Sequence, residues 1–246
     1  MNSLLLIFLS CLLLLMPWML SPRAYTANPI RPEVHGFLKL SWWLNAAYCG
    51  FWHRLTSNGF APLPPQGPAI LIANHTCGID HMLLQAKSGR VLGFMIAQEY
   101  YDFWACHLFC RLIGCIPVKR DGRDLSATRT ALRVLENGRV LPIFPEGKIH
   151  PTSGEEIGEI KPGAAFLAVH SRVPVIPAYL RGTPRTNLIG RSLYTPSCSR
   201  IRFGSPIDFS DIDPDIIGDK QAIHAYNERM TQSLLELQAK SVKIDA

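Results

Sequence analysis

The sequence predicts an α/β protein, a single layered domain with a mainly parallel central sheet flanked by helices. Short apolar runs alternate with amphipathic stretches along the chain, which is the pattern of alternating strands and helices. Several runs are uninterrupted by polar residues, as in Ala69–Ala73, and such runs are typical of strands covered on both faces. The length of 246 residues is sufficient for one domain of this kind with a sizeable core.

An apolar segment, Leu4–Leu20, precedes this domain, and we expect it to form a helical membrane anchor. It carries no charge, but as a helix it is about 25 Å long against a hydrocarbon core of roughly 30 Å, so spanning and dipping both remain open. A cleaved signal peptide is the alternative, although no Lys or Arg precedes the apolar run. Arg23 and Arg31 follow it. If the segment spans the membrane, these positive charges place the next domain on the cytoplasmic face.

The segment Val34–Leu55 is rich in aromatic residues, with Lys39, His53 and Arg54 among them. Tryptophans beside basic residues suit the headgroup level of a bilayer, so we expect an interfacial helix. A buried amphipathic helix is the alternative. We therefore divide the chain into N-terminal membrane-anchoring and interfacial helices (1–60) and one folded domain (61–246).

The elements of the folded domain follow in order. Strands are expected at 69–73, 91–96, 115–118, 140–144 and 173–179, with an edge strand at 199–203. Helices are expected at 80–86, 100–113, 125–137, 164–170 and 226–239. Pro174 and Pro177 favour an edge position or a bulge for the strand 173–179, because proline donates no ladder hydrogen bond.

The net charge of +6 favours an anionic membrane surface or a phosphorylated substrate. Nucleic acid is excluded as a partner, because the chain has no Lys/Arg run and no basic helix with interleaved aromatics. The seven cysteines are odd in number and form no CxxC pair. We therefore expect no disulfide framework and a body that faces a reducing compartment.

Polar residues follow three of the predicted strands: Asn74-His75, Lys119-Arg120 and Pro145-Glu146. In open α/β sheets, active sites gather beyond the carboxyl ends of the strands. If these strands are neighbours, the three segments converge on one site.

His75 and Asp80 are the candidate catalytic pair. With His75 in the strand-to-helix turn and Asp80 in the first turn of the helix, the carboxylate can hold one imidazole nitrogen and leave the other to take a proton. An ordinary polar turn histidine is the alternative. A metal site that adds Cys77 and His81 is a weaker one, because its spacing matches no usual zinc pattern.

The other two segments carry candidate binding residues. Arg120 and Arg123 near a strand end could form a fork for a phosphate. Taken alone, the segment favours a solvated loop in which Asp121 and Asp124 balance the charge. Glu146 stands before Gly147, whose backbone allows close approach, and its carboxylate can accept a hydrogen bond from a substrate hydroxyl. A tight turn is the alternative for that pair.

Taken in order, these segments resemble the glycerolipid acyltransferase family, typified by 1-acyl-glycerol-3-phosphate acyltransferase. The family's His-x4-Asp motif matches His75 and Asp80. Its second motif, Gly-x-Ile-x-x-x-Arg, matches Gly114, Ile116 and Arg120. Its Phe-Pro-Glu-Gly motif is intact as Phe144, Pro145, Glu146 and Gly147. Its fourth motif, an apolar strand that ends in Pro, matches Val175, Ile176 and Pro177. Lys161-Pro162-Gly163 also stands at the expected distance before the last motif. Four motifs in the right order make the resemblance specific.

The resemblance implies that 61–246 is an acyltransferase domain in which His75, oriented by Asp80, deprotonates a hydroxyl of a lysophosphatidate-like acceptor. That oxygen would attack the thioester of acyl-coenzyme A or acyl-acyl carrier protein and give phosphatidate. The resemblance also assigns phosphate binding to Arg120, assisted by Lys119 or Arg123, and acceptor positioning to Glu146 and Gly147. Pro177 enters only as the end of the last motif, among the substrate-binding candidates. No metal or organic cofactor is implied, and Cys77 is expected to be a bystander.

One departure from the family pattern bears on the acceptor: Lys148, Ile149 and His150 follow Phe-Pro-Glu-Gly, where many members have Thr or Ser and then Arg. Other acceptors, such as another lysophospholipid or an amino-lipid, therefore remain open, as does a catalytically silent membrane-binding homologue. A hydrolase is disfavoured, because no Gly-x-Ser-x-Gly elbow is present.

Overall fold

The central sheet of the protein has five strands in the order β1-β7-β6-β2-β5. The computed structural model describes residues 36–119, 124–150, 154 and 156–242. The strands of this sheet are β1 (Thr56–Ser57), β2 (Ala69–Ala73), β5 (Val140–Ile143), β6 (Val175–Arg181) and β7 (Arg200–Phe203). Only β6 and β7 pair antiparallel, while the other neighbours run parallel. The predicted α/β domain with a mainly parallel sheet is therefore confirmed.

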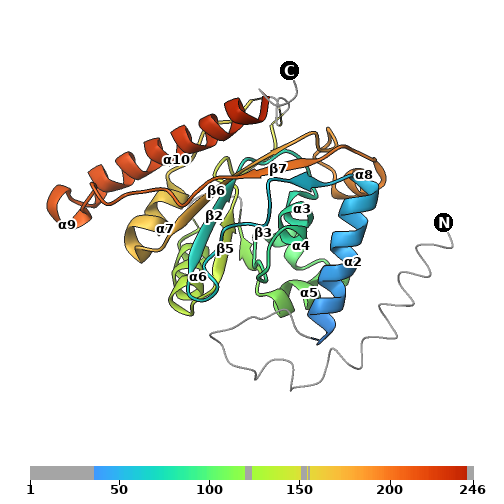
Figure 1. The fold of residues 1–246 in the computed structure, drawn as a ribbon. Helices are drawn as coiled ribbons and strands as arrows, with labels where there is room; N and C mark the ends of the chain where they lie inside the picture. The colour runs from blue at the N-terminus through green and yellow to red at the C-terminus, as the bar shows by residue number, and fades with distance from the viewer. Residues whose placement is uncertain (1–35, 120–123, 151–153, 155, 243–246) are drawn as a thin grey trace.

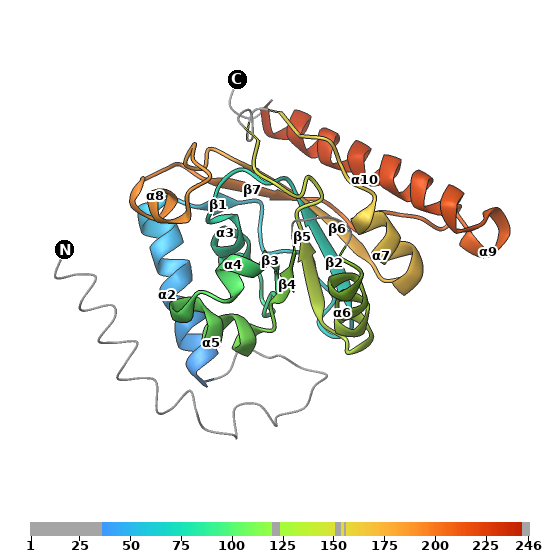
Figure 2. The same cartoon turned by 180° about the vertical axis from the view of Figure 1, so that it is seen from behind.

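Helices cover both faces of the sheet (Figures 1 and 2). Successive side chains of a strand point to opposite faces, so Ile70 and Ile72 pack into one core and Leu71 and Ala73 into the other. The first core includes residues of α6 (Leu125–Glu136), α7 (Gly163–Ser171) and α10 (Asp219–Val242). The second includes residues of α2 (Gly36–Trp52) and α3 (Asp80–Ala86). Burial on both faces explains the uninterrupted apolar sequence of β2.

The prediction of an edge position for the strand around Pro177 is wrong, because β6 lies between β2 and β7. The β6–β7 ladder begins at the pair Ala178–Phe203, so Pro177 faces the point where β7 ends. There the N–H of Gly204 donates to the Pro177 carbonyl at 2.9 Å. The missing donor of the proline therefore falls outside the ladder, and an internal strand tolerates it.

Two short parallel strands, β3 (Met95–Ala97) and β4 (Ile116–Val118), form a separate sheet. The convergence of three segments was expected on the condition that their strands are neighbours, and β4 does not meet this condition within the central sheet. The N–H of Ile116 donates toward β3, to Phe94, so Pro117 faces the other side and offers no donor to a further strand. The helix expected at 100–113 is divided into α4 (Gln98–Tyr101) and α5 (Trp104–Ile113).

Helix α2 occupies most of the predicted interfacial segment. Its inner side is tied to α3 and the following turn, because Trp42 Nε1 donates to the carbonyls of Gln85 and Ser88, each at 3.0 Å. Its outer side is apolar and exposed, with Trp43 at 63% and Phe51 at 83%. Among the helices that the structure describes, none is long and apolar enough to cross a bilayer. The expected anchor Leu4–Leu20 lies outside the described residues.

Three elements were not predicted: β1, α8 (Ile189–Tyr194) and α9 (Pro214–Ile217). All are short, and hydrophobic periodicity needs a window of about 11 residues to identify a helix. The last helix, α10, also begins earlier than expected, at Asp219.

Candidate active site

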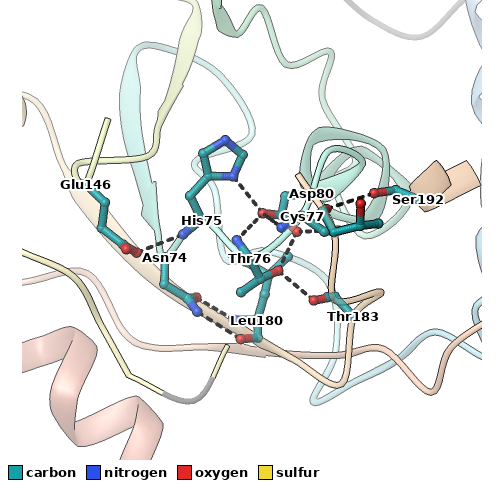
Figure 3. Close-up of polar contacts among 10 residues, drawn as sticks. Asn74, His75, Thr76, Cys77, Asp80, Glu146, Leu180, Thr183 and Ser192 are labelled. Carbon is teal, nitrogen blue, oxygen red and sulfur yellow. Dashed lines mark hydrogen bonds and ion pairs between the residues drawn. The ribbon is translucent and has the colours of Figure 1, made fainter. Parts of the chain in front are cut away.

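His75 lies in the turn that follows β2, and Asp80 is the first residue of α3. The turn brings the two side chains together, with His75 Nδ1 2.8 Å from Asp80 Oδ2. Figure 3 shows the other ring nitrogen pointing away from Asp80. The His75 side chain is 23% exposed, whereas that of Asp80 is fully buried. The predicted pairing of the two residues is therefore present, with one imidazole nitrogen held and the other directed elsewhere.

Asp80 collects hydrogen bonds from the whole turn (Figure 3). In addition to the hydrogen bond from His75, the Asp80 carboxylate accepts bonds from the backbone N–H groups of Thr76 and Cys77. The Thr76 hydroxyl donates to Oδ1 at 2.6 Å, and the Cys77 thiol donates to the same oxygen at 3.2 Å. A buried carboxylate with this many donors keeps its charge and its orientation.

Burial alone would raise the pKa of Asp80, but the hydrogen bond and charge of His75, followed by the Thr76 hydroxyl and the Cys77 backbone, hold that pKa below its ordinary value. An ionised Asp80 fixes the proton of His75 on Nδ1 and leaves Nε2 as the acceptor. Burial and then the Asp80 charge raise the pKa of the Cys77 thiol. Cys77 therefore stays protonated, as expected of a bystander.

An aromatic stack supports the imidazole. The ring of Phe144, which directly follows β5, lies parallel to that of His75, with centroids 4.2 Å apart and an interplanar angle of 11°. Phe94 extends the stack behind Phe144, with centroids 6.0 Å apart. The stack leaves His75 little freedom to rotate away from Asp80.

Glu146 lies beside His75 because β5 pairs directly with β2. Its carboxylate is almost fully buried, at 1% exposure. One oxygen accepts the backbone N–H of His75 at 2.9 Å, and the other accepts that of Gly158 at 3.1 Å. Burial raises the pKa of Glu146, and the two backbone donors offset part of that rise. Glu146 thus supports the backbone of the turn between β2 and α3, which we call the catalytic turn after the role proposed for His75. The role of Glu146 in acceptor binding remains a prediction.

Lys161 extends over the turn that contains Gly147. A Cβ placed at Gly147 would lie 2.9 Å from Lys161 Nζ, and Gly147 has a φ of +70°. The backbone N–H of Lys161 also donates to the Pro145 carbonyl at 3.0 Å. The positive φ therefore favours glycine at this position, and the absence of a side chain leaves room for the exposed ammonium group of Lys161 at the end of β5.

The catalytic turn is also attached to β6 and to the loop after it. The Asn74 side chain donates to the Leu180 carbonyl at 2.9 Å and accepts the Leu180 N–H at 2.7 Å. The hydroxyl of Thr183 donates to that of Thr76 at 2.8 Å. On the same side, a Cβ at Gly78 would lie 2.7 Å from Ile189 Cα, so α8 packs directly on the turn.

The other sequence-predicted site residues are placed differently. Lys119 follows β4 in the small sheet and is exposed, with its N–H bonded to Asp124. Arg120 and Arg123 lie outside the described residues. Pro177 is buried in β6, opposite Ile72, and its part in substrate binding stays a prediction. No group of His, Cys, Asp or Glu suited to a metal occurs in the described part of the chain.

A hollow of about 350 Å³ lies elsewhere, beside Val173, Pro174, Phe209 and Tyr226. Val173 and Pro174 precede β6, whereas His75 and Glu146 follow the carboxyl ends of parallel strands. The hollow therefore lies at the opposite end of the sheet from the catalytic pair, and it is no part of this site.

Comparison with known proteins agrees with the geometry of the site. A family model described as Acyltransferase matches residues 54–181. The 1-acyl-sn-glycerol-3-phosphate acyltransferase of Bacillus subtilis is 26% identical over 179 residues, 72% of this chain and 85% of that protein. The enzyme of the same name from Streptococcus pneumoniae is 30% identical over 148 residues, 58% of this chain and 51% of that protein.

The fold also has a counterpart among solved structures. The crystal structure of the 1-acyl-sn-glycerophosphate (LPA) acyltransferase PlsC from Thermotoga maritima superposes with a TM-score of 0.59 and 21% identity. The superposition covers 88% of this chain and 86% of that one. The family model spans more than half of the sequence and includes His75, Asp80 and Glu146. The chain therefore belongs to the acyltransferase family.

Proposed function

We propose that this acyltransferase moves a fatty acyl group from acyl-coenzyme A or acyl-acyl carrier protein to the free hydroxyl of a lysophosphatidate-like glycerophospholipid, giving phosphatidate. The observation that carries the proposal is the contact of 2.8 Å between His75 Nδ1 and the buried Asp80. It leaves the second imidazole nitrogen as the base. The names of the Bacillus and Streptococcus relatives supply the acceptor class.

The reaction follows from this arrangement. Nε2 of His75 takes the proton of the acceptor hydroxyl as the oxygen attacks the thioester carbonyl. A tetrahedral oxyanion forms, the C–S bond breaks, and the thiolate takes the proton back from the imidazolium. Asp80 stabilises the transient positive charge on His75. No covalent acyl-enzyme is required, which agrees with the buried and protonated Cys77.

Cations near the ends of β4 and β5 would bind the acceptor's phosphate. Arg120, with Lys119 or Arg123, is the assignment that the sequence motif supports. Lys161 is a further candidate, to which the motif reasoning gave no phosphate role, because its ammonium group lies over Gly147. A phosphate held there would lie at the end of the strand that adjoins the His75 strand.

Membrane attachment is the second part of the proposal. The outer side of α2 presents Leu40, Trp43, Leu44 and Phe51, and these positions share one face at helical spacing. An apolar face of this kind on a helix fixed to the catalytic domain suits the headgroup region of a bilayer. We place the catalytic domain on the cytoplasmic face, following Arg23 and Arg31.

A different lysophospholipid or an amino-lipid acceptor is the second candidate, favoured by Lys148, Ile149 and His150 after Phe-Pro-Glu-Gly. A catalytically silent homologue is disfavoured, because a protein without the chemistry has no need to surround a buried Asp80 with donors from three consecutive residues.

An acceptor panel tests the proposal. Purified protein is mixed with labelled acyl-coenzyme A or acyl-acyl carrier protein and with a series of lysolipids, and both thiol release and product identity are followed. We expect lysophosphatidate to be the preferred acceptor. Transfer only to lysolipids without a terminal phosphate would contradict the acceptor class, and no transfer to any lipid would contradict the enzymatic role.

The same assay tests the phosphate-binding residues. We expect Lys161→Ala and Arg120→Ala each to raise KM for the phosphate-bearing acceptor while KM for the acyl donor stays unchanged. Lys220→Ala, which removes an exposed cation at the start of α10, is the matched control for Lys161. Equal changes in both KM values would remove the residue from this role.

A further inference from the structure

Helix α8 and the carboxyl end of α2 form one continuous part of the surface. The Tyr48 hydroxyl of α2 donates to the Leu193 carbonyl of α8 at 2.6 Å. Behind this contact, His53 Nδ1 lies 2.9 Å from the hydroxyl of Ser197. Figures 1 and 2 both show α8 at the end of α2. The two elements are far apart in the sequence, but these buried polar contacts fix them to each other.

Three large apolar side chains and three arginines are exposed on this part of the surface. Phe51 is 83% exposed, Leu188 58% and Tyr194 69%. Arg54, Arg185 and Arg191 are also exposed. We refer to these six residues as the α2–α8 surface. Large exposed side chains grouped on two elements generally mark a contact with a partner or a membrane.

The charge of this surface has a single sign. No Asp or Glu occurs between Glu33 and Asp80 or between Glu159 and Asp208, and Asp80 itself is buried. The segments that supply the surface therefore contribute cations and no exposed carboxylate. Arginines around Phe, Leu and Tyr side chains complement an anionic headgroup layer above an apolar interior.

We infer that the α2–α8 surface docks on an anionic lipid bilayer and holds the catalytic turn against it. Ile189 of α8 is in contact with Gly78 of the turn, where a Cβ would have no room. A bilayer on this surface therefore lies next to the segment that contains His75. This inference rests on the proposed function and deepens it. It adds α8, from the second half of the chain, to the membrane contact proposed for α2. It also places the bilayer, the source of the acceptor lipid, beside the proposed base.

Hydrogen–deuterium exchange of the full-length protein tests this placement directly. The protein is compared alone, with phosphatidylcholine vesicles, and with vesicles of equal parts phosphatidylcholine and phosphatidylglycerol. We expect the anionic vesicles to protect the amides of α8 and of the end of α2, and to leave those of α6 unchanged. Binding of the vesicles without protection of α8 would overturn the inference, as would absence of binding. Because this readout involves no acyl transfer, it is independent of the proposed reaction.

A pair of variants connects docking to activity. The double variant Leu188→Ser/Tyr194→Ser removes two apolar side chains of the α2–α8 surface. The control, Ile216→Ser/Leu235→Ser, removes two exposed apolar side chains of α9 and α10. With long-chain acceptor in anionic vesicles, we expect transfer by the first variant to fall about tenfold, since losing roughly 1.4 kcal/mol of lipid contact has that effect. With a short-chain acceptor that is monomeric in solution, both variants should match the unsubstituted protein. Equal loss with both acceptors would indicate misfolding of the turn and overturn the docking role.

Discussion

The carboxylate of Glu146 accepts the backbone N–H of His75, the residue whose side chain is bound by Asp80. The proposed base is thus held at two points, its backbone by Glu146, which follows β5, and its ring by Asp80 of α3. The carboxylates of Glu146 and Asp80 are both buried. Losing a hydrogen bond to a buried carboxylate is costly, because water cannot replace the missing partner.

Glu146→Gln tests the backbone contact. The two carboxylate oxygens of Glu146 accept the N–H groups of His75 and Gly158. Glutamine has a single acceptor oxygen, so one of these N–H groups loses its partner. We expect kcat to fall about ten- to hundredfold, from a cost of roughly 1–3 kcal/mol, with KM for the acceptor nearly unchanged. Steady-state kinetics measures the split. A raised KM with normal kcat would instead assign Glu146 to acceptor binding, as the family resemblance implies.

His75→Ala removes the base itself. We expect kcat to fall by about 10²- to 10⁴-fold, the usual contribution of a positioned general base. Unfolding by urea should occur at a similar concentration, because His75 is partly exposed. His224→Ala, at an exposed histidine of α10, serves as the control and should retain full activity. Turnover at the normal rate in the His75 variant would refute the catalytic pair.

Gly78→Ala tests the contact between the catalytic turn and α8. The new methyl group would lie 2.7 Å from Ile189 Cα, which is backbone and cannot rotate away. We expect a loss of about 1–3 kcal/mol in the free energy of unfolding, typical of overpacking, together with reduced transfer. Gly50→Ala in α2 meets no atom within 4 Å and should leave stability unchanged or raise it by about 0.5–1 kcal/mol. Equal stability of the two variants would mean that α8 does not press on the turn.

His81 gives the protein an acid-sensitive position. Burial lowers its pKa from 6.5 to about 4, so the unfolded chain binds this proton more readily than the folded one. Its contribution to stability is therefore present above pH 6.5 and is lost as the pH falls toward about 4. We expect His81→Gln to remove up to about 3 kcal/mol of this pH dependence. Urea unfolding at several pH values measures it, and an unchanged slope in the variant would contradict the assignment.

The sequence predicts the parts of the fold that depend on local pattern. The apolar run Ala69–Ala73 and the helix Asp80–Ala86 occur with the expected bounds, because an uninterrupted apolar run and an acidic first helical turn are local signals. The catalytic pair is predictable for the same reason, since only four residues separate His75 from Asp80.

The sequence does not predict relationships that depend on pairing. The pairing of β4 with β3, outside the central sheet, joins segments about twenty residues apart and has no local signal in either strand. The bond from Thr183 to Thr76 joins residues 107 positions apart, and neither residue carries a signal for it. The position of Lys161 over Gly147 likewise depends on how the loop after β5 returns to the turn.

The internal position of β2, between β6 and β5, bears on the order in which the protein can assemble. Its partners are β5 and β6, and the pair Ile70–Val175 joins positions more than a hundred residues apart. Contacts this distant in sequence form slowly, because a long loop must close first. During synthesis, the segment around His75 therefore emerges well before the strand that secures it, and we expect refolding chains to gain helical structure before they gain activity.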